Sequence, residues 1–186
     1  MPPKVKTTKE DVINAAINIV RDNGVQALNA RTIANFLNCS TQPIFSNFAT
    51  MEELRISVIE KADELYQKYI HHEIESECYP VYKSTGMAYI RFAKEEKELF
   101  KLLYMRDRTN EASHEASKLD GEINAIVKTS TGLEEKDAQL FHLEMWAYVH
   151  GIATMFATGF LDLEWELVSK MLTDSYQGLR KQYGME

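Results

Sequence analysis

Proline and glycine are scarce in this sequence, which has 4 prolines and 8 glycines among 186 residues. The prolines stand at positions 2, 3, 43 and 80, so long stretches carry neither of the two residues that break helices. Such stretches favour helices, and no strand-like alternation, internal repeat or low-complexity run is present. We therefore expect an all-α chain.

Cysteine is rarer still, since Cys39 and Cys78 are the only two. This number is too small for the disulfide framework of a secreted domain, and neither cysteine has the spacing of a zinc ligand. The run from His71 to Cys78 is better explained as a solvated helix end than as a metal site. The sequence also lacks a glycine-rich phosphate loop and a recognisable nucleophile motif. We expect no metal, no cofactor and no catalytic residue.

Long apolar runs are missing too. The longest uncharged stretch, residues 145–161, falls short of the roughly 18 residues that a membrane span needs, so we expect a buried helix there. The first ten residues carry Lys4, Lys6 and Lys9 but no apolar core of a signal peptide. These absences together predict a cytoplasmic protein.

Positive charge is in the minority, and the formal net charge is −7. Residues 1–50 nevertheless hold five basic and three acidic residues, which leaves −9 for the remainder. Phosphates respond to the local field and not to the charge of the whole chain. The balance therefore permits nucleic-acid binding by the N-terminal segment without indicating it strongly.

Helix signals in the first third of the chain are closely spaced. Thr8 can cap a first helix that Gly24 closes, and a second helix covers about residues 29–37. Asn38 tolerates a positive φ and suits a sharp turn, after which Ser40 caps a third, short helix. The sequence Thr-Met-Glu-Glu from Thr50 is a capping box that starts a long fourth helix. Further helices are expected near residues 82–95, 98–105, 112–128, 134–159 and 163–183.

The third helix has the properties of a DNA-reading helix. Ile44 and Phe48, four residues apart, would anchor it, while its outward side chains are Thr41, Gln42, Ser46 and Asn47. Amide side chains make bidentate contacts to adenine, and hydroxyls contact base edges or phosphates. The backbone N–H groups at the Thr50 helix start suit a phosphate. The alternative is a helical hairpin of a bundle, in which these polar residues are only caps.

The segment from Ala30 through Asn38–Phe48 to Leu54 resembles the N-terminal domain of TetR-family regulators, over residues 8–60. The resemblance implies that Arg31, Thr41, Gln42, Pro43, Phe45 and Asn47 contact DNA. From their chemistry and position we add Ser40, Ser46 and Thr50. We expect a DNA-binding domain at 1–50 and a ligand-binding and dimerisation domain at 51–186, joined by the long fourth helix.

Residues 60–186 resemble the variable helical domain of that family, and 146–151 (Trp-Ala-Tyr-Val-His-Gly) are similar to a signature of one branch. A ligand wedged among these helices would tilt the fourth helix and release the DNA. We expect an apolar or aromatic ligand. The candidate pocket residues are Tyr66, Tyr89, Phe92, Leu103, Tyr104, Met105, Met145, Trp146 and His150, most of which are ordinary core residues by default.

The last two helices predict a homodimer. The penultimate helix is apolar or small on two sides, so both sides must be buried, and the last helix has a seam of near-heptad spacing. The expected interface residues are Gly151, Thr154, Thr158, Trp165, Val168, Leu172, Tyr176 and Leu179. In the alternative, both helices only close the core of one chain.

The sequence thus predicts a ligand-relieved repressor that binds a palindromic operator as a homodimer. Two alternatives stay open: an enzyme built on a helical bundle, and a helical interaction module that does not bind DNA.

Overall fold

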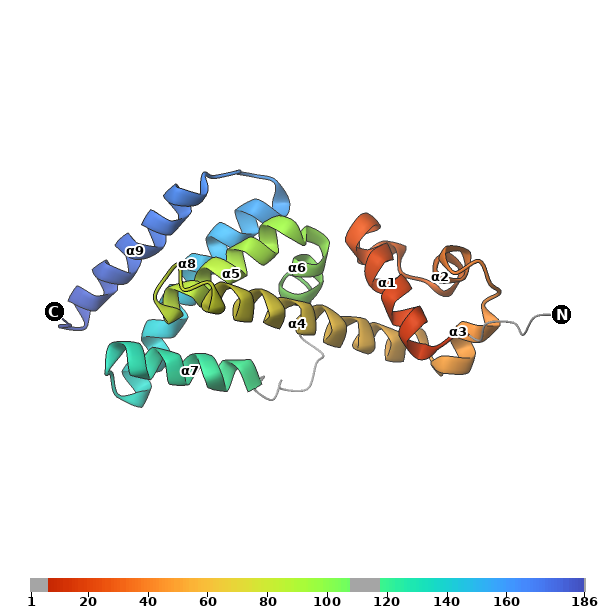
Figure 1. Cartoon of the computed structure of the whole chain (residues 1–186), viewed down its shortest axis with the longest axis horizontal. Coiled ribbons are helices and arrows are strands. Elements are labelled where there is room, and N and C mark those ends of the chain that lie inside the picture. The colour runs from red at the N-terminus through yellow and green to blue at the C-terminus, as the bar shows by residue number, and fades with distance from the viewer. Residues whose placement is uncertain (1–6, 108–117, 186) are drawn as a thin grey trace. The chain divides into compact units, whose positions relative to one another are not determined.

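The computed structural model describes residues 7–107 and 118–185, and all regular structure within them is helical, as predicted (Figure 1). The expected helix at 112–128 begins at residue 118 in the described part, and residues 112–117 lie outside it. In chain order the helices are α1 (Lys9–Asn23), a 3-10 turn (Val25–Ala27), α2 (Ala30–Phe36), α3 (Gln42–Asn47), α4 (Met51–Glu75), α5 (Val81–Glu95), α6 (Lys97–Tyr104), α7 (Lys118–Thr131), α8 (Glu135–Thr158) and α9 (Trp165–Gln182).

Helix α1 starts and stops near the predicted residues. Thr8 Oγ1 accepts from the Asp11 N–H at 3.1 Å and the Asp11 carboxylate accepts from the Thr8 N–H at 2.8 Å, which completes a capping box. These hydrogen bonds lower the pKa of Asp11. Gly24 ends the helix at φ +77°, but its ψ of 168° lies outside the left-handed helical region that the sequence predicted. The 3-10 turn that follows was not predicted.

One compact unit comprises Met1–Leu65 and Glu96–Arg106. This division differs from the predicted boundary at residue 50. The first turns of α4 belong to this unit, because Leu54, Val58 and Ala62 are completely buried. Helix α6 packs on α1, and Glu96 just before it pairs with Arg21 at 2.7 Å.

The second unit comprises Tyr66–Glu95 and Asp107–Glu186. Helix α5 packs mainly on α8 and also contacts α7 and α9. Gly86 allows the close approach, since a Cβ there would lie 3.1 Å from Leu172 Cδ2 and 3.4 Å from Val149 Cγ2. The Lys83 ammonium adds a polar link from α5 to α9, donating to Ser169 Oγ at 2.7 Å.

None of the helices in residues 7–107 and 118–185 has the length and apolarity that a bilayer span requires.

Candidate nucleic-acid interface and ligand site

Helices α2 and α3 form a tight helix-turn-helix. Asn29 begins α2 by accepting from the N–H groups of Arg31 and Thr32, at 3.1 and 3.0 Å. Asn38 adopts φ +51°, which confirms the predicted turn residue. The Cys39 N–H then donates to the Ala34 carbonyl at 2.9 Å and closes the turn. Asparagine makes this turn without the strain that a branched side chain would suffer.

The start of α3 differs from the prediction. The N-cap is Thr41 and not Ser40, and no described N–H donates to the Thr41 side chain. The reason is local. Pro43 has no N–H, and the Ile44 N–H donates to the Thr41 carbonyl at 3.2 Å, so the backbone donors that a capping side chain needs are missing or engaged.

The orientation of α3 follows from its two apolar anchors. Ile44 is 0% and Phe48 1% exposed, so one face of the helix is fixed in the core of its unit. Phe45, one residue further round, is 52% exposed. The predicted DNA-contact residues divide into exposed side chains (Arg31, Ser40, Thr41, Gln42, Phe45, Ser46 and Thr50) and half-buried ones (Pro43 and Asn47).

Two of the predicted contact residues on α3 already use their donors. Asn47 Nδ2 donates to the Thr7 carbonyl at 3.2 Å and to the Pro43 carbonyl at 2.7 Å. Two carbonyl partners fix the orientation of the amide and engage both of its hydrogens. Ser46 Oγ donates to the Gln42 carbonyl at 2.9 Å. With these hydrogen bonds in place, Asn47 and Ser46 can contact a base only by accepting a hydrogen bond at the side-chain oxygen.

The predicted capping box at Thr50 is present only in part, because the Glu53 carboxylate bonds the N–H of Ala49 and not that of Thr50. Thr50 Oγ1 accepts from the Glu53 N–H at 3.1 Å, and the Glu53 carboxylate accepts from the Ala49 N–H at 2.8 Å. Glu52 and Glu53 thus place negative charge in the first turn of α4. This charge opposes the predicted phosphate contact at the helix start, where Thr50 keeps its hydroxyl proton as a donor.

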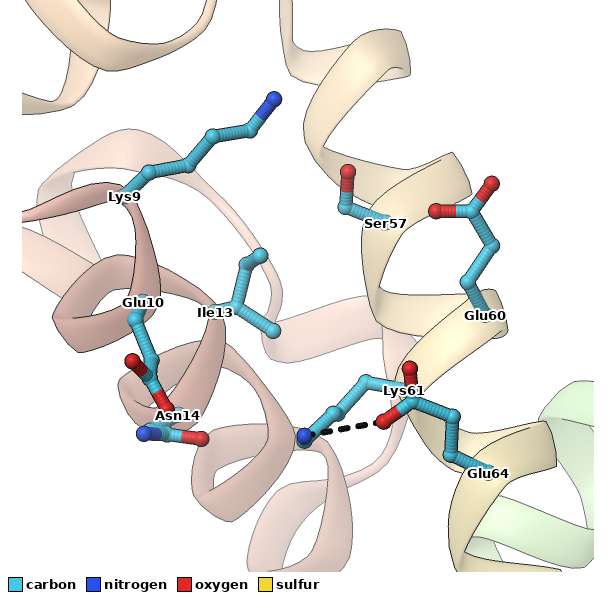
Figure 2. A pocket seen from close by; sticks show the side chains of 8 residues that line it. All are labelled: Lys9, Glu10, Ile13, Asn14, Ser57, Glu60, Lys61 and Glu64. Carbon is cyan, nitrogen blue, oxygen red and sulfur yellow. Dashed lines mark hydrogen bonds and ion pairs between the residues drawn. The ribbon is translucent and has the colours of Figure 1, made fainter.

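A shallow cleft of about 390 Å³ lies between α1 and the first half of α4 (Figure 2). Its lining alternates in charge, with Lys61 and Glu64 paired at 2.9 Å, and Ile13 is its apolar contributor. A charged, open lining does not suit the apolar or aromatic ligand that the sequence predicts.

Five of the predicted pocket residues form an aromatic cluster in the second unit. Tyr66 lies against Tyr89 and Phe92, with ring centroids 5.7 and 5.4 Å away. The Tyr89 hydroxyl is hydrogen-bonded to His150 Nδ1 at 2.9 Å, and the His150 ring stacks on Trp146 at 4.9 Å. Trp146 remains 40% exposed, so the cluster runs from the core to the surface.

The remaining pocket candidates lie outside this cluster. Met145 is buried, with its sulfur accepting from Ser175 Oγ at 3.8 Å. Leu103, Tyr104 and Met105 belong to the other compact unit, where Tyr104 packs on Phe100 at 5.2 Å between ring centroids.

Burial favours the neutral forms of Tyr89 and His150 in the aromatic cluster. Burial raises the pKa of the Tyr89 phenol, and the neighbouring Tyr66 adds to the effect. Burial also lowers the pKa of His150, which favours its neutral form. A neutral aromatic surface suits a flat apolar ligand or an aromatic cation attracted to the ring faces.

The predicted interface residues fall into two groups. Val168 and Leu172 are 0% and 2% exposed within their own chain, so we reassign these two to the core of the single chain. Their apolar face is covered by the packing of α9 on α5 and α8. The exposed or half-buried residues are Gly151, Thr154, Thr158, Trp165, Tyr176 and Leu179.

Helix α8 also exposes large apolar side chains on the side predicted for the interface. Leu140 is 49% and Leu143 57% exposed, and Ala147 and Gly151 continue the same side of the helix. Their spacing places these residues along one stripe, which we call the α8 outer stripe: Leu140, Leu143, Ala147, Gly151, Thr154 and Thr158. The amphipathic spacing of α8 could have revealed Leu143, because it lies one turn before Ala147.

The sequence matches one protein-family model, and the fold matches several solved structures. Residues 83–174 match the family described as "Tetracyclin repressor-like, C-terminal domain". No curated protein matches the sequence.

Solved structures share the fold at low identity. A protein of unknown function from Rhodococcus sp. RHA1 is 21% identical, with a TM-score of 0.76 over 96% of this chain and 98% of that one. A TetR-like transcriptional regulator from the same organism is 14% identical, with a TM-score of 0.66 over 99% of both chains. The multidrug binding protein EbrR complexed with ethidium is 17% identical, with a TM-score of 0.65 over 94% of this chain and 99% of that one.

Proposed function

This chain belongs to the TetR family of transcriptional regulators, and from that premise we propose that it is a repressor that binds a palindromic operator as a homodimer and releases it when an aromatic ligand binds. The observation that carries the DNA-binding part is the presentation of α3. Its buried side chains, Ile44 and Phe48, hold the helix in place while Gln42, Phe45 and Ser46 stay exposed. A short helix with this division fits a major groove.

The second unit supports the proposal of a homodimer. Helix α8 leaves the outer stripe uncovered although its opposite side is packed in the core. Contiguous exposed apolar area of this kind marks an interaction surface. A second copy of the same stripe would cover it with two-fold symmetry, which also gives two recognition helices for half-sites about 34–36 Å apart or a multiple of that spacing.

The aromatic cluster supports the ligand proposal. Trp146 offers a partly exposed ring, with His150 and Tyr89 behind it. The fold-related EbrR forms complexes with ethidium and with malachite green, both aromatic cations. We propose that this chain accepts a ligand of the same class, held by stacking and by cation–π attraction on Trp146.

The DNA-binding proposal is tested by selection from duplexes with a randomised centre, followed by titration of the selected duplex. We expect a palindromic sequence to be enriched. Gln42→Ala should weaken binding to it by roughly 5- to 150-fold per half-site, because a bidentate base contact contributes about 1–3 kcal/mol of discrimination. The melting temperature should stay nearly unchanged, since Gln42 is exposed. An enzyme or an interaction module would enrich no sequence and would bind duplexes only weakly, with strong salt dependence.

The ligand proposal is tested with malachite green. In a Trp165→Phe background Trp146 is the only tryptophan, because the chain has two. We expect the dye to quench Trp146 fluorescence with saturation, and to weaken DNA binding of the protein at the same concentrations. Trp146→Ala should weaken dye binding by roughly 3- to 30-fold, as expected for the loss of one cation–π and stacking contact. Equal release of DNA from Trp146→Ala and wild type would show that the dye acts on the DNA and would contradict the proposal.

A further inference from the structure

Lys83 holds its ammonium among uncharged partners. Its Nζ donates to Ser169 Oγ at 2.7 Å and to Thr173 Oγ1 at 2.9 Å, both on α9. The same atom lies 4.7 Å from the centroid of the Tyr79 ring. Six other lysines of the described part lie beside a carboxylate instead: Lys9, Lys61, Lys94, Lys101, Lys128 and Lys170. The partners of Lys83 thus supply dipoles and a ring, and no full negative charge.

The place of Lys83 in the fold also disfavours a positive charge. It is the third residue of α5, and the first turn of that helix carries no acid. The unpaired backbone N–H groups at a helix start give partial positive charge there, which opposes a cation. The side chain is half-buried, and burial lowers the pKa of the Lys83 amine. More of this amine is therefore unprotonated near neutral pH than in an ordinary lysine.

The two hydroxyls suit the neutral amine as well as the ammonium. Ser169 Oγ accepts a hydrogen from the ammonium, and it can donate its own proton to the amine once that has lost one. Thr173 Oγ1 donates to the Ser169 carbonyl at 3.0 Å, so it stays an acceptor for Lys83. Thr173 is exposed, which places the amine at the edge of the surface and within reach of a small reagent.

We propose that Lys83 is an acylation site, at which the amine takes the acyl group of an acyl phosphate and thereby breaks its link to α9. The neutral amine attacks the carbonyl carbon, a C–N bond forms, and the bond from that carbon to the phosphate oxygen breaks. Inorganic phosphate leaves with the electron pair, and the proton of the amine passes to water. A small anionic donor suits an amine at a helix start, where the positive end of the helix attracts phosphate. The inference goes beyond the proposed function and does not rest on DNA binding.

The reactivity is tested on the full chain with acetyl phosphate near neutral pH. Mass spectrometry of the digested protein gives the initial rate of acetylation at each lysine. We expect Lys83 to react at least about 3-fold faster than the exposed Lys68, and faster again than Lys128, whose pKa is raised by its hydrogen bond to Glu135. A rate at Lys83 no higher than at these two lysines would overturn the inference.

Two variants of Ser169 separate charge from access. Ser169→Asp places a carboxylate beside the amine and favours the ammonium, so acetylation of Lys83 should slow by at least about 5-fold. Ser169→Asn has nearly the same shape without the charge, and should leave the rate within about twofold of wild type. Lys68 in the same samples should react at its wild-type rate. Equal slowing of Lys83 in both variants would mean that access, and not the charge of its partners, sets the rate, and would also overturn the inference.

The effect on α9 is tested with Lys83→Gln, an uncharged analogue of the acylated residue. The amide cannot replace the ammonium that donates to Ser169 and Thr173, so the melting temperature should fall by about 2–4 °C. Lys68→Gln removes the same charge from an exposed position of α4 and should melt as wild type does. Equal melting temperatures in the two variants would contradict the proposed release of α9.

Discussion

Phe45→Glu is expected to weaken specific DNA binding by at least about 100-fold while the protein stays folded. The ring of Phe45 is 52% exposed on α3, so its replacement removes little from the core. On DNA it would lie against apolar groove atoms such as a thymine methyl. A carboxylate there faces the phosphates, and like-charge juxtaposition at an interface costs several kcal/mol. The measurement is a fluorescence anisotropy titration with the selected duplex, together with thermal unfolding.

The matched control is Val81→Glu. Val81 is exposed to a similar degree, 47%, and is the first residue of α5, in the other compact unit. It receives the same charge, so the net charge of the two variants is identical. We expect binding within about twofold of wild type for this control, since a distant exposed charge is largely screened. Equal losses in both variants would mean that overall charge, and not the position of α3, sets the affinity.

The element that carries the DNA proposal could be predicted because its signals are local. The capping box at Thr8, the side-chain cap that Thr50 gives to α4 and the positive φ at Asn38 each depend on residues within three or four positions. The apolar spacing of Ile44 and Phe48 fixed which side of α3 faces outward. The start of α3 could not be predicted as well, since Ser40 and Thr41 are both good capping residues. Which of the two residues becomes the N-cap depends on the backbone, where the Ile44 N–H donates to the Thr41 carbonyl.

Contacts distant in sequence were beyond prediction. Asn47 is a good adenine-reading residue by composition, and nothing near it in the chain indicates that Thr7 holds its amide. The burial of Val168 and Leu172 could not be predicted for the same reason. Their spacing indicates an apolar face of α9 but not which element covers it. Helix α5 packs close to this face because Gly86 lacks the Cβ that would crowd Leu172.

The two units have different roles in the proposed mechanism. The first presents α3, and the second carries both the aromatic cluster and the α8 outer stripe. Trp146 and Gly151 stand five residues apart on α8, so a ligand that moves Trp146 acts on the same helix that would pair with a second chain. Since α4 spans both units, a change in the second unit has a continuous helix through which to reach the first.

Gly151→Arg is expected to convert the dimer into monomers and to weaken operator binding by about 100-fold or more. A Cβ at Gly151 would meet no atom of the described residues within 4 Å, so the single chain tolerates a side chain there. Arginine in place of a helical glycine even favours the isolated helix by about 0.5–1 kcal/mol. In a two-fold interface along the α8 outer stripe, the same side chain would bring an unpaired charge into the contact from both copies. Each monomer would then hold the DNA through one half-site only.

Light scattering after size-exclusion chromatography measures the oligomeric state, and anisotropy measures the affinity. Ala125→Arg on α7 is the control, because Ala125 is exposed on a helix outside the proposed interface and the substitution adds the same charge. This variant should remain a dimer with wild-type affinity. If Gly151→Arg instead stays dimeric and binds as wild type does, the chains pair through another surface. If wild type is itself a monomer, the arginine should only raise the melting temperature, and the two-half-site mechanism fails with the dimer on which it depends.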